Sequence, residues 1–164
     1  MKDKWKQRIG YGIGTLGRDM VATMVSMYMI FYMTDIVKVP KNILGYVTSI
    51  IIFMRLFDGI NDPVMGSIID NTKSKWGKFK PWLFIGMIFW GIFHVMLFYD
   101  TGLEGMGFVI FFFIVYLLWE ISYTMNDIAF WSMIPSLSRD QKEKEKIGSI
   151  ARIFASIGMF AFVV

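Results

Sequence analysis

Long apolar runs separated by short polar segments make up most of this sequence. A helix needs about 20 mostly apolar residues to cross the hydrocarbon of a bilayer. The runs at about 9–33, 42–69 and 107–135 exceed that length, and the run at about 81–98 lies within the usual range of about 17 to 25 residues. A fifth run begins at about 147 and continues to 164. The pattern therefore predicts an all-α membrane protein with four complete transmembrane helices and a truncated fifth.

The composition agrees with a membrane protein and excludes several other classes. In 164 residues, 55% are apolar and 18% aromatic, which is too apolar for a soluble domain of this size. The net charge of +4 gives no reason to expect nucleic acid as a partner. The absence of cysteine excludes disulfides, thiol catalysis and cysteine metal sites. The basic start leads into an apolar run too long for a cleavable signal peptide.

Basic residues are distributed unevenly between the connecting segments. Twelve lie before the first run or in the second and fourth loops: Lys2, Lys4, Lys6, Arg8, Lys73, Lys75, Lys78, Lys80, Arg139, Lys142, Lys144 and Lys146. The other two loops hold only Lys38 and Lys41. Because basic loops stay in the cytoplasm, we expect a multi-pass protein of the cell membrane with a cytoplasmic N-terminus. The alternating charges at 142–146 are expected to be a solvated helix end.

Glycines are concentrated in the first half of the first run. Gly10, Gly12, Gly14 and Gly17 favour close packing against another helix. A glycine-rich phosphate loop would need a preceding strand, and the sequence before Gly10 does not predict one.

Two carboxylates lie inside the second apolar run. Asp58 and Asp62 are four residues apart, which places them on one face of a helix with Asn61 beside them. An ionisable group at membrane depth is costly unless it faces a polar interior with a partner charge or ion. This pattern indicates an oxygen-ligand site for a small cation or a pair of proton acceptors.

Eight charged residues lie at membrane depth: Asp19, Asp58, Asp62, Glu120, Asp127, Arg18, Arg55 and Arg152. At ~1.5 Å per residue, the acids at 19, 62 and 127 are all roughly 12 to 15 Å from the cytoplasmic side. This common depth predicts one convergent site. Arginine pairing, as expected for Arg55 with Asp58, would explain some of these acids, but the acids outnumber the bases by five to three.

The fourth run carries polar residues at helical spacing. Glu120, Thr124, Asp127 and Trp131 follow one another at intervals of four, three and four, so they share a face. Carboxylates can bind sugar hydroxyls while an aromatic ring covers the apolar face of the ring. This face therefore suits a polyol substrate.

Three motifs occur in order along most of the chain. They are Arg55-x-x-Asp58-x-x-Asn61-Asp62-Pro63-x-x-Gly66, then Lys75-Trp76-Gly77-Lys78-Phe79-Lys80-Pro81-Trp82, then Tyr123-Thr124-x-x-Asp127-x-x-Phe130-Trp131-Ser132-x-x-Pro135. Together they resemble the glycoside-pentoside-hexuronide:cation symporters, the melibiose permease type of the major facilitator superfamily.

The resemblance implies a major facilitator type fold and sugar symport coupled to Na⁺, H⁺ or Li⁺, with no other cofactor. It implies cation contacts at Asp58, Asn61, Asp62, Thr124 and Asp127, with the carboxylates at 58, 62 and 127 as ligands of an alkali cation. It implies sugar contacts at Arg18, Asp19, Tyr123, Asp127, Trp131 and Arg152. Glu120 matches no functional position of the family, so its role rests on spacing alone.

Members of that family have twelve helices in two halves, with the sugar path between the halves. We therefore expect this chain to be an N-terminal fragment that lacks its C-terminal partner half and does not transport alone. A loop motif runs from Gly66 and Asp70 to Lys78. We expect it to brace one conformation through charge contacts at helix ends, or simply to signal topology.

Other functions were compared with sugar symport. A membrane enzyme would need a nucleophile or a metal cluster, but His94 stands alone among apolar neighbours and is expected to be a packing residue. A cation channel could use acids at one depth, although an aromatic beside the acids favours an occluding pocket. A membrane binding protein without transport is the remaining alternative.

Overall fold

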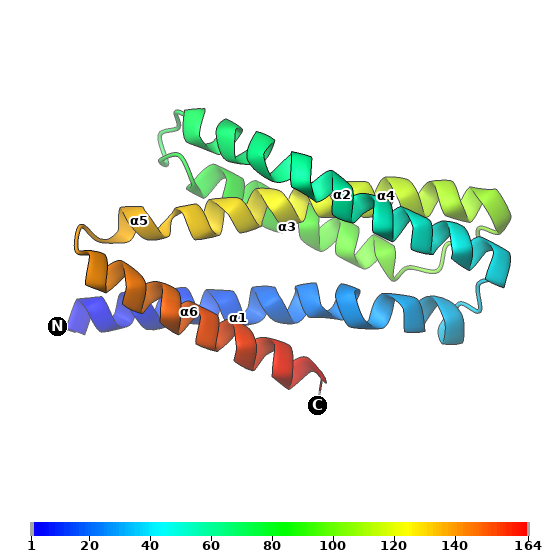
Figure 1. Ribbon diagram of the computed structural model, residues 1–164, viewed down its shortest axis with the longest axis horizontal. Helices are drawn as coiled ribbons and strands as arrows, with labels where there is room; N and C mark the ends of the chain where they lie inside the picture. Colours follow the sequence, from blue (N-terminus) through cyan, green and yellow to red (C-terminus); the bar gives the residue numbers. More distant parts are fainter. Residues whose placement is uncertain (1, 164) are drawn as a thin grey trace. The chain divides into compact units, whose positions relative to one another are not determined.

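The computed structural model describes residues 2–163, apart from the side chains of residues 2, 3 and 162. Helices make up most of this range (Figure 1). They are α1 (Lys2–Phe31), the π-helix η1 (Tyr32–Ile36), α2 (Lys41–Asn71), α3 (Lys80–Leu97), α4 (Gly105–Ser132), α5 (Ile134–Leu137) and α6 (Gln141–Val163). No strand occurs in the described range, which confirms the all-α fold.

Three segments within residues 2–163 are long and apolar enough to cross a membrane. They are Lys41–Asn71, Lys80–Leu97 and Gly105–Leu137. The predicted span at 9–33 lies in α1 and η1, where Arg18, Asp19 and the glycines lower the hydropathy. The predicted last span lies in α6, except for residue 164, which is outside the described residues.

Two helix starts differ from the sequence-based expectation. Helix α1 begins at Lys2, seven residues before the predicted start at 9. The expected loop at 138–146 instead contains the first turns of α6, which begins at Gln141. The side chain of Asp140 accepts a hydrogen bond from the backbone N–H of Lys142 at 3.1 Å. This N-cap explains why a densely charged segment is already helical.

Residues 2–31 and 133–163 form one compact unit, in which α1 and α6 lie side by side and run in the same direction (Figure 1). A Cβ added to Gly158 would lie 2.6 Å from the carbonyl oxygen of Leu16, so only glycine fits this close approach. Of the four glycines expected to pack, Gly12 is buried against Phe154, whereas those at 10, 14 and 17 are exposed.

Residues 32–132 form the second unit, in which α4 packs against both α2 and α3. Between α3 and α4, the Asn126 side-chain amide donates to the carbonyl oxygen of Leu83 at 3.1 Å. Aromatic rings contact one another in sequence along α4 and continue onto Trp90 of α3: Phe108, Phe112, Tyr116, Trp119 and Tyr123.

One face of α2 is apolar and exposed. Ile52, Leu56, Ile60 and Val64 recur every four residues, and the side chains of Leu56 and Ile60 are 71% and 70% exposed. The opposite face carries Val47, Met54, Met65 and Ile69, all buried. An apolar stripe of this length left uncovered is typical of a helix that faces lipid.

Candidate functional site

The buried face of α2 contains two polar residues of the predicted cation site. Asp58 and Asn61 follow Met54 at helical spacing and precede Met65, so they are directed to the side of α2 that packs on α4. Within residues 2–163, neither the buried Asp58 Oδ1 nor the buried Asn61 Nδ2 has a hydrogen-bond partner. Buried polar atoms without partners are uncommon and often mark a site that a ligand completes.

The other carboxylate oxygen of Asp58 faces Arg55. The distance from Arg55 Nη1 to Asp58 Oδ2 is 3.9 Å, and the Arg55 side chain is 61% exposed. The predicted ion pair between these two residues is therefore present, but its distance is long and its arginine is exposed to solvent. Such a pair contributes little to stability. Arg55 approaches only Oδ2 of Asp58, so Oδ1 is available to another ligand.

Asp62 lies one turn beyond Asp58 and is exposed. Pro63 directly follows Asp62 and lies inside α2. Because proline has no N–H, the carbonyl oxygen of Gly59 has no donor four residues ahead. Sequence reasoning missed this oxygen, although Pro63 was the signal for it.

Helix α4 supplies the other predicted cation residues. Thr124 is buried and Asp127 is half-buried. The indole Nε1 of Trp131 donates to Asp127 Oδ1 at 3.0 Å, so the predicted neighbours one turn apart are in contact. Tyr123 stacks on Trp119 with ring centroids 5.7 Å apart. Trp131 is thereby held beside the carboxylate of Asp127, and that it covers a sugar ring stays a prediction.

Glu120 lies one turn before Thr124 on the same helix. Its side chain is buried at 2% exposure, and its Oε1 atom has no hydrogen-bond partner among residues 2–163. The Tyr116 hydroxyl is within hydrogen-bonding reach of its carboxyl group. The charged groups of α2 near it are Asp58, Arg55 and Asp62.

The acids of α2 and α4 do not form a three-carboxylate cluster. Within the described part of the chain, no three His, Cys, Asp or Glu side chains are placed to hold a metal ion together. Asp62 is exposed, whereas Asp127 is engaged by Trp131, and this explains why the set at 58, 62 and 127 is not assembled. A cation there would need neutral oxygens or a closer approach of the helices.

The remaining sugar candidates lie in the unit of α1 and α6. Arg18 Nη2 is 3.1 Å from Asp19 Oδ1, and Arg18 is buried. Arg152 of α6 is exposed. That these residues join Tyr123, Asp127 and Trp131 in one sugar site stays a prediction.

His94 packs among aromatic rings, as expected. Its ring centroid is 5.4 Å from that of Phe98 and 6.5 Å from that of Trp90. Among residues 2–163, it joins no group that could hold a metal ion.

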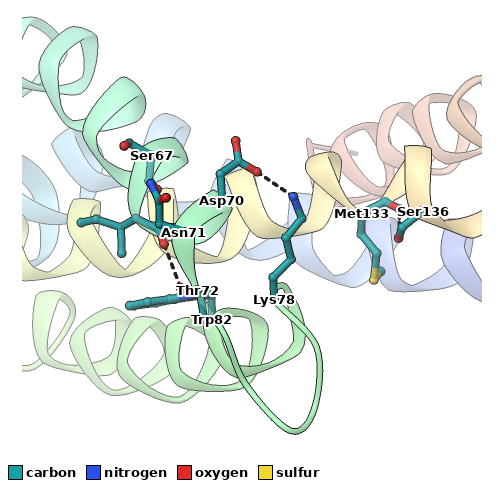
Figure 2. Close-up of polar contacts among 9 residues, drawn as sticks. Ser67, Asp70, Asn71, Thr72, Lys78, Trp82, Met133 and Ser136 are labelled. Atoms are coloured by element: carbon teal, nitrogen blue, oxygen red, sulfur yellow. Dashed lines mark hydrogen bonds and ion pairs between the residues drawn. The ribbon is translucent and has the colours of Figure 1, made fainter.

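The loop between α2 and α3 contains the predicted charge contact. Lys78 Nζ is 2.8 Å from Asp70 Oδ1, and Trp82 Nε1 donates to Thr72 Oγ1 at 2.8 Å (Figure 2). Gly77 has φ of 86°, a left-handed conformation that favours glycine. The loop thus ties the end of α2 to the start of α3. Whether it braces one transport conformation stays a prediction.

Comparison with known proteins decides the family. The family described as MFS/sugar transport protein matches residues 10–164. This chain belongs to that family. Together with the three apolar helices, membership makes it a multi-pass membrane protein.

Three curated relatives are similar to this chain over most of its length. A lactose permease of Leuconostoc lactis is 34% identical over 96% of this chain and 26% of its own length. A raffinose carrier protein of Pediococcus pentosaceus is 33% identical over 92% of this chain and 25% of its length. The inner membrane symporter YicJ of Escherichia coli (strain K12) is 32% identical over 93% of this chain and 33% of its length.

These relatives are named as a permease, a carrier and a symporter, which supports the expectation of a transporter over an enzyme. They also confirm the resemblance to sugar symporters of the major facilitator superfamily. The chain spans about 26% of the length of the lactose permease it matches.

The unit of α1 and α6 contains one further contact that sequence reasoning missed. Glu143 was expected on a solvated helix end, yet it is buried, and both of its oxygens accept 2.7 Å hydrogen bonds from Arg8. The bidentate pair joins the first turns of α6 to α1 outside the membrane-spanning segments.

The hydrogen bonds between Arg8 and Glu143 lower the pKa of Glu143 and raise the pKa of Arg8. The capping sequence Asp140-x-x-Glu143 was the available signal for an ordered helix start.

Proposed function

We propose that this chain is the N-terminal part of a cation-coupled sugar symporter of the cell membrane, with its N-terminus in the cytoplasm. The observation that carries the proposal is the contact of Trp131 with Asp127 beside the buried Thr124, on a helix that packs against the Asp58 face of α2. The Asp127 carboxylate is thus a proposed ligand of the ion and also contacts Trp131, the ring proposed to cover the sugar. The relatives named for lactose and raffinose support a glycoside as the substrate.

The proposed division of labour follows from the chemistry of the side chains. Asp58, Asn61, Asp62, Thr124 and Asp127 supply oxygens of the kind that small hard cations prefer. Arg18, Asp19, Tyr123, Asp127, Trp131 and Arg152 supply the hydrogen bonds and the flat apolar face that a sugar ring requires. Na⁺, H⁺ or Li⁺ is the coupling ion, and no other cofactor takes part. The C-terminal half completes the path.

Asp127 is the proposed link between the two ligands. A bound cation would orient its carboxylate and reduce the electrostatic cost of the site for the sugar. By linkage, each ligand then raises the affinity for the other by the same factor. A cation channel would show no such reciprocal effect, so this coupling separates the two functions.

The test is a titration of sugar binding against Na⁺ in the complete transporter. We expect Trp131→Ala to weaken sugar binding by about tenfold or more while keeping the cation affinity. We expect Asp127→Asn to lose sugar binding together with its cation dependence. Trp76→Ala and Asp100→Asn, which change exposed loop residues, serve as matched controls. Unchanged coupling in Asp127→Asn would contradict the proposal.

A further inference from the structure

Glu120 is a buried acid to which neither the family motifs nor the proposed function assign a role. It is 2% exposed, and the other buried acid among the described residues is Glu143. Unlike Glu143, it has no arginine in hydrogen-bond contact in the described part of the chain. A buried carboxylate oxygen without a partner is costly in the charged form, and either a proton or a cation beside it removes that cost.

The available positive charge around Glu120 is insufficient. Arg55 is the only arginine or lysine in the apolar spans at 42–69, 81–98 and 107–135, which contain four acids. Its guanidinium is 3.9 Å from Asp58 and largely exposed. One largely exposed arginine cannot neutralise both Asp58 and Glu120.

The orphaned atoms lie on facing helices. Asp58 Oδ1 on α2 and Glu120 Oε1 on α4 are both buried and both lack a hydrogen-bond partner within residues 2–163. Asp58 is one of the charged neighbours of Glu120 on α2. Since α2 packs directly on α4, a single small cation between the two helices would satisfy both oxygens.

The other neighbours of Glu120 leave this position to a ligand. Tyr116 is within reach of the carboxyl group on α4 itself. On the α3 side, Trp90 packs against Trp119 and Tyr123, and His94 packs against Trp90 and Phe98. Thus α3 brings aromatic packing to α4 and no charge in contact with Glu120.

We propose that Glu120 is a ligand of the coupling cation and binds a small monovalent ion together with Asp58 at the interface between α2 and α4. Glu120 is seven residues before Asp127, so it extends the acids of the site by two helical turns along α4. This inference rests on the proposed function, because it adds a ligand to the ion site of the same symporter. It also accounts for the unpaired oxygens that the motif residues leave unexplained.

The experiment measures Na⁺ binding to this chain in lipid nanodiscs by the shift of its thermal unfolding. A ligand that binds only the folded state raises the melting temperature in a saturable way. NaCl is titrated against choline chloride at constant ionic strength. We expect a saturable Na⁺ shift in the parent chain. We expect Glu120→Gln to weaken the apparent Na⁺ affinity by about tenfold or more.

Two variants control for indirect effects. Glu104→Gln removes an exposed carboxylate just before α4 and should keep the parental Na⁺ response. Glu120→Asp keeps the charge but shortens the side chain, and should retain a weakened response. Far-UV circular dichroism of each variant must match the parent, so that a lost response reports binding and not unfolding.

The outcomes separate this inference from the proposed function. An equal Na⁺ response in Glu120→Gln and Glu104→Gln, or no Na⁺ response in the parent, overturns the inference. If the response is lost in Asp127→Asn but not in Glu120→Gln, the ion site of the proposed function stands without Glu120. If it is lost in Glu120→Gln while sugar binding never depends on Na⁺, the ligand assignment holds and the coupling fails.

Discussion

Arg8 and Glu143 hold each other through two 2.7 Å hydrogen bonds in fork geometry. The pKa of Glu143 is lowered, first by this hydrogen bond from Arg8. A lowered pKa in the folded state means that the unfolded chain binds more protons at mildly acidic pH. The pair therefore stabilises the fold fully above the unfolded pKa of a glutamate, about 4.3. The stabilisation is lost as the pH falls through the lower, folded value.

At the residue scale we predict that Glu143→Gln lowers the melting temperature at pH 7, because Arg8 loses its charged partner. The difference from the parent should shrink as the pH is lowered through the folded pKa of Glu143. Thermal unfolding in detergent at stepped pH measures both effects. Glu145→Gln, a change at an exposed residue of the same helix turn, is the control. A variant that melts like the parent at pH 7 would show that the pair has no structural role.

At the scale of helices, the packing of α1 on α6 depends on one backbone approach. A Cβ at Gly158 would lie 2.6 Å from the Leu16 carbonyl oxygen and 3.3 Å from its carbonyl carbon. A backbone atom cannot rotate away as a side chain can, so relief requires the two helices to separate. The contact of Gly12 with Phe154 is softer, because a ring can shift.

We therefore predict that Gly158→Ala destabilises the chain by about 1 to 3 kcal/mol, the usual cost of overpacking a tight contact. Gly17→Ala is the matched control on α1, since nothing lies within 4 Å of the added Cβ. That change should be neutral or stabilising by about 0.5 to 1 kcal/mol, because alanine favours a helix over glycine. Unfolding in a denaturant series measures both. Equal stability of Gly158→Ala and the parent would contradict the close approach.

At the scale of the whole molecule, charge and apolar surface together predict how the protein lies in a bilayer. Twelve basic residues lie in the N-terminal segment and in the loops around 73–80 and 139–146, whereas the loop at 99–104 has none. The exposed stripe of Ile52, Leu56, Ile60 and Val64 lies between the ends of α2. Lipid contact for the stripe and a cytoplasmic position for the basic loops are compatible.

Because the chain has no cysteine, single cysteines can report this topology directly. We predict that a membrane-impermeant maleimide labels Thr101→Cys in intact cells. Lys75→Cys should be labelled only after the membrane is permeabilised. Ile60→Cys should resist labelling in both conditions, since a thiol in hydrocarbon does not ionise. Labelling of Lys75→Cys from outside intact cells would reverse the proposed orientation.

The sequence by itself determined the helices, the membrane character and the chemistry of the candidate site. Long apolar runs separated by charged loops predict membrane-spanning helices. A backbone can cross hydrocarbon only with its hydrogen bonds satisfied, as in a helix or a closed barrel. The spacing of Asp127 and Trp131 fixes a local contact, since residues four apart on a helix are neighbours, and the structure shows that hydrogen bond. The pairing of Arg55 with Asp58 is local for the same reason.

Only the tertiary structure decided which residues of these patterns are buried, and against what. Their spacing places Asp58 and Asp62 on one face of α2, yet the packing of α4 only partly covers Asp58 and leaves Asp62 exposed. The sequence separation between Arg8 and Glu143 is 135 residues, and no local rule predicts that α1 and α6 bring them together. The same holds for Glu120, whose unpaired oxygen becomes visible only when α2 is packed on α4. Burial and long-range pairing depend on how helices meet, which helical periodicity along one segment does not encode.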